Sequence, residues 1–213
     1  MTSAVSKKPG KGLSDGVISE LAAYFDILPG HDEELRAAVR RFTQAVRDLD
    51  PETGIRTGLR DTRHVIFDDG RRLLWCTTFE NDWDAYIDAC LLLIGIEPFL
   101  DWMRHTLQGR ALAWLTPGLA VQDGGRSDPE VEVIVRTGTR LKAILQSVQT
   151  PAAACFNPLG PLTLRQIITA QRLHRALRQV LGNPAAEEVL KHPALQPLLR
   201  QAAALQLRDV SMP

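Results

Sequence analysis

The 213-residue sequence predicts an α+β fold in which an antiparallel sheet is backed by amphipathic helices. One observation is the turn signal Asp68-Asp69-Gly70, which separates two apolar stretches at 62–67 and 73–79 and is typical of a β-hairpin. The other is Asn81 or Asp82, either of which can cap a helix whose apolar residues then recur at helical spacing. Together they predict strand, turn, strand and helix in that order.

Before the hairpin, the pattern predicts one strand and one helix. Residues 18–28 alternate between apolar and more polar side chains, as a strand with one buried face does. Pro29 and Gly30 end this pattern, and Asp32 is the expected helix cap. The apolar stripe of the helix consists of Leu35, Val39, Phe42, Val46 and Leu49. The residues from Pro51 to Gly58 are expected to form a loop.

After the hairpin, the signals are mostly helical. The helix that begins near Trp83 is expected to break around Gly95 and to continue over 99–107. No helix or strand is predicted for residues 110–127. Residues 129–148 fit two interpretations. Alternating valines favour a strand, whereas the opening Asp-Pro-Glu at 128–130 and the length of the pattern favour a helix, which we prefer.

The C-terminal part predicts one short strand and three helices. An apolar run at 152–156 is a candidate closing strand. Thr163 and Gln166 form a capping-box pattern at the start of a helix that stops near Gly182. Shorter helices are expected near 185–190 and 194–207.

Composition excludes several classes of protein. Apolar residues make up 45%, and 25 basic side chains balance 25 acidic ones, so nothing indicates a general electrostatic affinity for nucleic acid. No apolar run has the length of a transmembrane helix. The three cysteines are far apart and odd in number, which argues against a disulfide framework or a zinc site. We therefore expect a cytoplasmic protein with neither a transmembrane segment nor a nucleic-acid partner.

The order of elements between residues 18 and 156 is that of a ferredoxin-like split βαββαβ antiparallel sheet. Residues 28–35 (LPGHDEEL) resemble the strand-to-helix junction of dimeric α/β-barrel proteins of the antibiotic-biosynthesis monooxygenase type. Residues 63–70 (RHVIFDDG) with 79–88 (FENDWDAYID) are similar to a hairpin-and-helix block of uncharacterised ferredoxin-like bacterial proteins. The resemblance covers residues 18–108.

This resemblance gives an expected domain organisation. Residues 1–16 are expected to be a disordered tail, and residues 17–158 the ferredoxin-like α+β domain with a helical insertion near 109–150. Residues 159–213 are expected to be a C-terminal helical extension packed on the domain. The insertion and the extension depart from the compact monooxygenase pattern.

The resemblance also implies a function. In such proteins the open face of the sheet meets a second open face, within one chain or across a homodimer, and the enclosed pocket binds haem or a small aromatic molecule. An oxidoreductase of monooxygenase or peroxidase type is thus implied. No catalytic residue is shared across these relatives, so the catalytic residues and the cofactor are left open.

Five residues are candidate ligand contacts: Arg63, His64, Trp75, Phe79 and Tyr86. The imidazole of His64 suits an axial haem ligand or a proton-transfer group, and the alternative is a strand histidine that pairs across the sheet. Arg63 suits a carboxylate or propionate, and the alternative is a cross-strand ion pair. The rings of Trp75 and Phe79 suit a planar ligand, and the alternative for them, as for Tyr86, is packing in the core.

No further catalytic or metal signature is present. The sequence contains no glycine-rich phosphate loop, zinc-ligand spacing or nucleophile elbow, and His105 and His174 lie far apart, so no metal site is predicted. The alternative function is a non-catalytic interaction or accessory module. It rests on the absence of any reactive cluster, and the helices of residues 160–207 would bind a partner protein or a second copy. The first of these helices has a basic side with Arg165, Arg172, Arg175 and Arg178.

Overall fold

The computed structural model describes residues 12–110 and 128–209, with side chains described for 12–110 and 138–204. It divides into two compact units, Met1–Leu164 and Arg165–Pro213. Each unit is described by itself, because the positions of the parts relative to one another are not determined.

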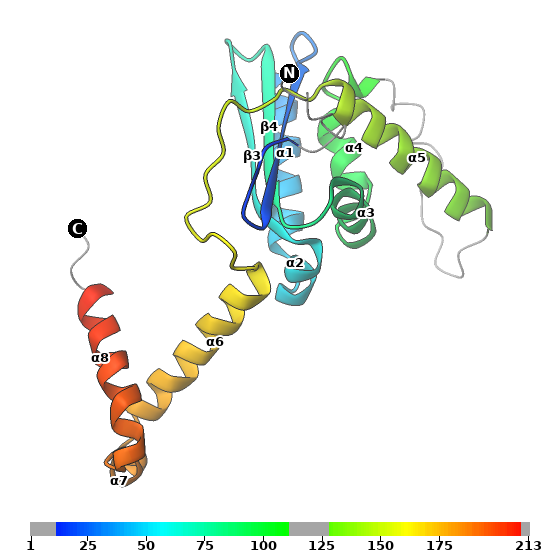
Figure 1. The fold of residues 1–213 in the computed structure, drawn as a ribbon. Helices are drawn as coiled ribbons and strands as arrows, with labels where there is room; N and C mark the ends of the chain where they lie inside the picture. The colour runs from blue at the N-terminus through cyan, green and yellow to red at the C-terminus, as the bar shows by residue number, and fades with distance from the viewer. Residues whose placement is uncertain (1–11, 111–127, 210–213) are drawn as a thin grey trace, which may run out of the picture. The chain divides into compact units, whose positions relative to one another are not determined.

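The first unit is built on a four-stranded antiparallel sheet (Figure 1). Its strands are β1 (Ser14–Asp15), β2 (Ile18–Asp26), β3 (Leu59–Phe67) and β4 (Arg72–Phe79), in the spatial order β1-β2-β4-β3. The predicted α+β class, the first strand and the hairpin are thus confirmed. β1 lies within the range predicted as a disordered tail.

The hairpin turn requires unusual backbone geometry. Asp68, Asp69 and Gly70 all have positive φ angles, of 56°, 50° and 78°. Aspartate and glycine tolerate this left-handed region better than other residues, which is why the Asp-Asp-Gly sequence predicts the turn correctly.

The described residues of the first unit form five α-helices: α1 (Asp32–Arg47), α2 (Pro51–Thr57), α3 (Trp83–Leu93), α4 (Glu97–Met103) and α5 (Asp128–Ser147). The helix interpretation of residues 129–148 is confirmed by α5. The N-cap of α1 is His31 and not Asp32, which lies inside the first turn together with two glutamates. The acidic first turn stabilises the positive end of the helix dipole.

The loop predicted from Pro51 to Gly58 is wrong, because this segment forms α2. The carboxylate of Asp50 accepts hydrogen bonds from the backbone N–H groups of Glu52 (2.9 Å) and Thr53 (3.1 Å). Pro51 occupies the first turn and Gly58 closes the helix with a φ of 69°. A strong N-cap, an N-terminal proline and a C-terminal glycine were all visible in the sequence.

The continuation of the helix over 99–107 is also wrong, because α4 ends at Met103. The next residues turn back to the end of β2, where the N–H of Leu28 donates to the carbonyl of His105 (3.0 Å) and the N–H of Leu107 donates to that of Asp26 (2.8 Å). These backbone bonds to a distant strand replace the helical ones.

The closing strand predicted at 152–156 is absent: the structure assigns no strand to this segment. The free edge of β2 is occupied by β1 and by residues that follow α4 and α5; the N–H of Thr150 donates to the carbonyl of Ala22 at 2.8 Å. Pro151 has no N–H to continue this pairing. The last strand of a split βαββαβ sheet is therefore replaced by short contacts, and the ferredoxin-like arrangement stays unconfirmed.

The core lies between one face of the sheet and the helices. It contains alternate side chains of β2 and β4, which point to the same side, and side chains of α1, α3, α4 and α5. Its largest fully buried members are Trp75, Trp102, Phe25, Phe79 and Phe99. We call this helix-covered side the closed face and the opposite side the open face.

The second unit contains the end of the chain. After α6 (Leu164–Leu181) come η2 (Pro184–Ala186), α7 (Glu187–Leu190), η3 (Pro193–Leu195) and α8 (Gln196–Asp209). These elements confirm the three helices predicted for this region. Among the described residues, no helix combines the length and apolar character needed to cross a bilayer.

Candidate functional site

The open face of the sheet is the first candidate site. Neighbouring residues of a strand point to opposite faces, so Arg63 lies on the open face and His64 on the closed face. The open face has an apolar centre that we define by six side chains: Ala22, Tyr24, Val65, Phe67, Leu74 and Cys76.

The register of the strands brings this apolar centre together. Leu74 on β4 lies between Tyr24 on β2 and Val65 on β3. Val65 is 46% exposed and Phe67 is 39% exposed, and Tyr24 meets Phe67 edge-on with ring centroids 6.5 Å apart. Such an apolar patch on a sheet face is the kind of surface that binds a ligand or another protein.

Charged side chains surround the apolar centre. Arg72 lies 5.7 Å from the ring centroid of Tyr24 and is paired with Asp68 at 3.0 Å. The hydroxyl of Tyr24 donates to Asp26 at 3.1 Å. On β3, Arg63 is paired with Asp61 at 3.0 Å, two residues before it on the same strand and not across the sheet.

Cys76 lies opposite Arg63 in the sheet register. Burial raises the pKa of its thiol above the ordinary value, and the nearby Arg63 opposes this shift. The thiol is therefore protonated at neutral pH, which does not suit a nucleophile.

His64 is surrounded by aromatic rings on the closed face. Its ring centroid lies 5.3 Å from that of Phe42, 5.2 Å from that of Trp102 and 6.1 Å from that of Trp75. Burial lowers the pKa of His64 to about 4. Its Nε2 atom is buried and has no hydrogen-bond partner in the part of the chain that the structure describes.

These surroundings do not fit haem at His64. An axial ligand needs open space beside its coordinating nitrogen, whereas the neighbours of this imidazole are three packed aromatic side chains. None of the three described cavities is lined by His64. We therefore assign no haem-binding role to this residue.

The other three candidates are core residues. Trp75 is 1% exposed and donates from Nε1 to the hydroxyl of Thr62 at 2.9 Å. Phe79 and Tyr86 stack with centroids 4.2 Å apart, and the Tyr86 hydroxyl lies 2.7 Å from that of Thr77. Burial raises the pKa of Tyr86 well above its ordinary value. The structure thus places Arg63 apart from the other four candidates.

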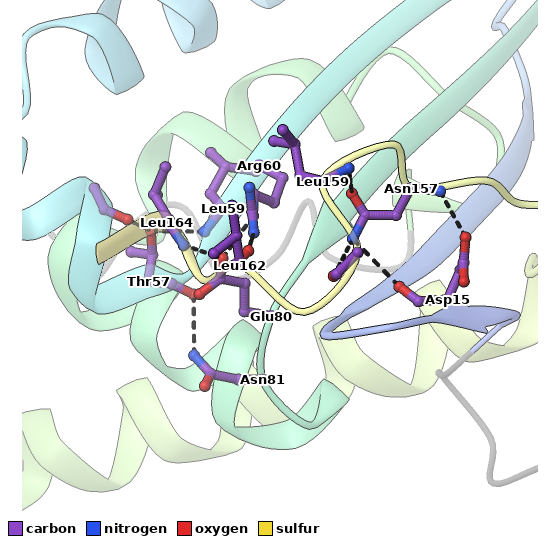
Figure 2. Close-up of polar contacts among 12 residues, drawn as sticks. Asp15, Thr57, Leu59, Arg60, Glu80, Asn81, Asn157, Leu159, Leu162 and Leu164 are labelled. Atoms are coloured by element: carbon purple, nitrogen blue, oxygen red, sulfur yellow. Dashed lines mark hydrogen bonds and ion pairs between the residues drawn. The ribbon is translucent and has the colours of Figure 1, made fainter. Parts of the chain in front are cut away.

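A group of hydrogen bonds and an ion pair holds residues 157–164 against the sheet (Figure 2). The N–H of Asn157 donates to Asp15 Oδ2 at 2.7 Å. Arg60 pairs with Glu80 at 2.5 Å and donates to the carbonyl of Leu162, while Glu80 accepts from the N–H of Leu164. We call these contacts the polar clip.

The polar clip borders a polar cavity of about 520 Å³, whose lining includes Ser14, Ser19, Glu80, Asn81, Asp82 and Thr163. Sequence reasoning missed the clip because its partners are 142, 102 and 84 residues apart. No local pattern marks such contacts. The clip uses both Arg60 and Glu80 for structure, and this leaves the open face as the better candidate site.

We compared the chain with models of protein families, with curated proteins and with solved structures, and none of the three comparisons finds a match. Within residues 12–110 and 128–209, no group of three or more histidine, cysteine, aspartate or glutamate side chains is placed to hold a metal ion.

Proposed function

We propose that this protein forms a homodimer that binds a small apolar or aromatic molecule between the open faces of two copies. The observation that supports it is the apolar centre of the open face, where Val65 and Phe67 are 46% and 39% exposed. Stable interfaces have an apolar middle and a polar rim, and the open face has both. Burying the centre against a second copy removes apolar surface from water and so stabilises the dimer.

The charges of the rim are paired within one copy. Asp61 is bound by Arg63 at 3.0 Å, and Asp68 at the hairpin binds both Arg71 (2.6 Å) and Arg72 (3.0 Å). These pairs border the apolar centre without adding a net charge of one sign that would repel a second copy, and they fix the orientation of the two sheets more than they add affinity.

Arg63 indicates the chemistry of the ligand. Its side chain is 65% exposed and stands beside the apolar centre. A guanidinium binds carboxylates and other oxyanions through two parallel hydrogen bonds, and Tyr24 and Phe67 supply aromatic surface nearby. We therefore propose an anionic aromatic molecule as the ligand. An oxidoreductase reaction of monooxygenase or peroxidase type on this ligand extends the proposal, and we assign no catalytic residue for it.

The dimer is tested by Phe67→Glu. A carboxylate at this position of the interface must be desolvated, and its register neighbour Arg72 is already paired with Asp68 at 3.0 Å, so the variant is expected to be a monomer. Size-exclusion chromatography with light scattering should give the mass of two chains for the natural protein and of one for Phe67→Glu. Leu92→Glu, at a 68% exposed position on α3, is the matched control and should stay dimeric. A monomeric natural protein, or dimers of all three, would contradict the interface.

The ligand site is tested by Arg63→Gln with the anionic aromatic dye 1-anilinonaphthalene-8-sulfonate. The natural dimer should enhance the dye's fluorescence, and Arg63→Gln should need about tenfold more protein to do so, since a hydrogen bond to a charged group is worth about 1.5–3 kcal/mol. Arg56→Gln, on the exposed part of α2, is the control. Equal binding by both variants would remove Arg63 from the site.

A second candidate function is an interaction module, and one observation favours it. No residue of α6 is buried, and Leu173 and Val180 are 69% and 48% exposed. Leu173→Glu distinguishes the two candidates in the same mass measurement. If Leu173→Glu is a monomer and Phe67→Glu is a dimer, α6 forms the contact between the two copies. If Phe67→Glu is a monomer and Leu173→Glu is a dimer, the open face forms it.

A further inference from the structure

We propose that His31 and His105 together bind one divalent transition-metal ion through their Nδ1 atoms. The two Nδ1 atoms lie 3.0 Å apart, with ring centroids separated by 5.4 Å and ring planes inclined by 50°. The residues are 74 positions apart in the chain, so the pair is a product of the fold. The sequence, in which these histidines are isolated, predicts no metal site.

The backbone holds both histidines at the end of β2. The N–H of His31 donates to the carbonyl of Leu28 at 3.0 Å, and the carbonyl of His31 accepts from Leu35 at 2.9 Å as α1 begins. The carbonyl of His105 accepts from the N–H of the same Leu28 at 3.0 Å. One residue of the turn after β2, Leu28, thus holds the backbone on both sides of the pair.

The separation of the nitrogen atoms suits a shared ion. Imidazole nitrogens lie about 2.0–2.1 Å from Zn²⁺, so two of them at angles of roughly 90–109° are about 2.9–3.4 Å apart. The observed 3.0 Å falls in this range. Without metal, one Nδ1–H donates to the other Nδ1. Metal binding requires only that this proton move to Nε2 of the same ring, since both rings stay neutral.

The charges around the pair are compatible with a cation. Two carboxylates, those of Asp101 and Glu34, lie close enough to His105 to interact with it electrostatically, and they offset the positive charge of Arg104. Asp101 is already paired with Arg41 at 2.8 Å, whereas Glu34, exposed on the first turn of α1, forms no ion pair with any described residue.

Two imidazoles select the class of ion. Imidazole suits Zn²⁺, Cu²⁺ and Ni²⁺, whereas Mg²⁺ and Ca²⁺ prefer oxygen ligands. Since no third protein ligand is in place among the described residues, solvent fills the other positions and the ion is exchangeable. Bound metal would join the turn before α1 to the segment after α4.

The test is calorimetric titration of the full chain with Zn²⁺ at pH 7.5. We expect one ion per chain, and at least about tenfold weaker binding for His31→Asn and for His105→Gln, because even loss of an outer-shell partner costs about 10–100-fold. His31→Asn keeps a good N-cap residue for α1. His174→Gln, which removes an exposed histidine of α6, should bind as the natural protein does.

Thermal unfolding gives a second readout. Zn²⁺ should raise the melting temperature of the natural protein and of His174→Gln but not that of His31→Asn or His105→Gln, whereas Mg²⁺ should raise none of them. Cooperative melting of the metal-free variants shows that they fold. The proposal is overturned if the natural protein binds no Zn²⁺, or if folded His31→Asn and His105→Gln bind it as tightly as His174→Gln.

Discussion

The protein is expected to lose about 3 kcal/mol of folding stability through His64 as the pH falls from about 6.5 to about 4. Burial lowers the folded-state pKa of His64 from 6.5 to about 4, whereas the unfolded chain keeps the ordinary value. Above pH 6.5 both states are neutral at this site. Between the two pKa values only the unfolded state takes up the proton, so stability falls with pH; below pH 4 this contribution is constant.

Urea denaturation of His64→Leu measures this effect. The substitution removes the titrating group while keeping an apolar side chain of similar size, so the difference in unfolding free energy between pH 7 and pH 4 should shrink by about 3 kcal/mol. His174→Gln removes an exposed histidine and should keep the full pH dependence. Identical pH profiles for all three proteins would show that His64 titrates in the folded state as it does in water.

The buried, aromatic surroundings of His64 also limit its chemistry. A histidine whose charged form is disfavoured at neutral pH is a poor proton donor, and the Nε2 atom of His64 is buried. The sequence shows a histidine on a strand next to an arginine and cannot show which of the two faces the helices. In the structure His64 faces the helices, and Arg63 is the residue whose side chain is exposed and can reach a ligand.

The predicted elements that are confirmed depend on local signals. The Asp-Asp-Gly turn needs positive φ angles that few other residues adopt, and the apolar stripe of α1 buries Leu35 and Phe42 as its spacing predicts. The signals for helix α2, which is predicted as a loop, are also local: Asp50 is its cap, and the proline and glycine that favour a loop stand at the two ends of the helix.

The other wrong predictions concern choices between distant partners. Residues 152–156 have a strand-like composition, but the edge of β2 is already paired with residues from three other segments. The pair of His31 and His105 and the polar clip likewise join positions that no periodicity connects. A single sequence shows which side chains are apolar, whereas these contacts depend on which distant segments lie side by side in the folded chain.

Trp75→Ala is expected to lower the unfolding free energy by about 3–5 kcal/mol, the usual loss for removing a buried aromatic side chain. Trp75 is 1% exposed, packs against Trp102 with centroids 5.8 Å apart, and also contacts His64 and Phe99. Its removal leaves a cavity and breaks the hydrogen bond that the Trp75 Nε1–H donates to the hydroxyl of Thr62.

Chemical denaturation distinguishes this structural role from the ligand-stacking role that the sequence also allowed. Phe156→Ala, at an 82% exposed position, is the matched control and should change stability by less than about 0.5 kcal/mol. If Trp75 served a ligand, Trp75→Ala would keep the unfolding midpoint of the natural protein and lose only dye binding. Because Trp75 is on the closed face, we expect the opposite: a large fall in the midpoint, and normal dye fluorescence under conditions in which the variant remains folded.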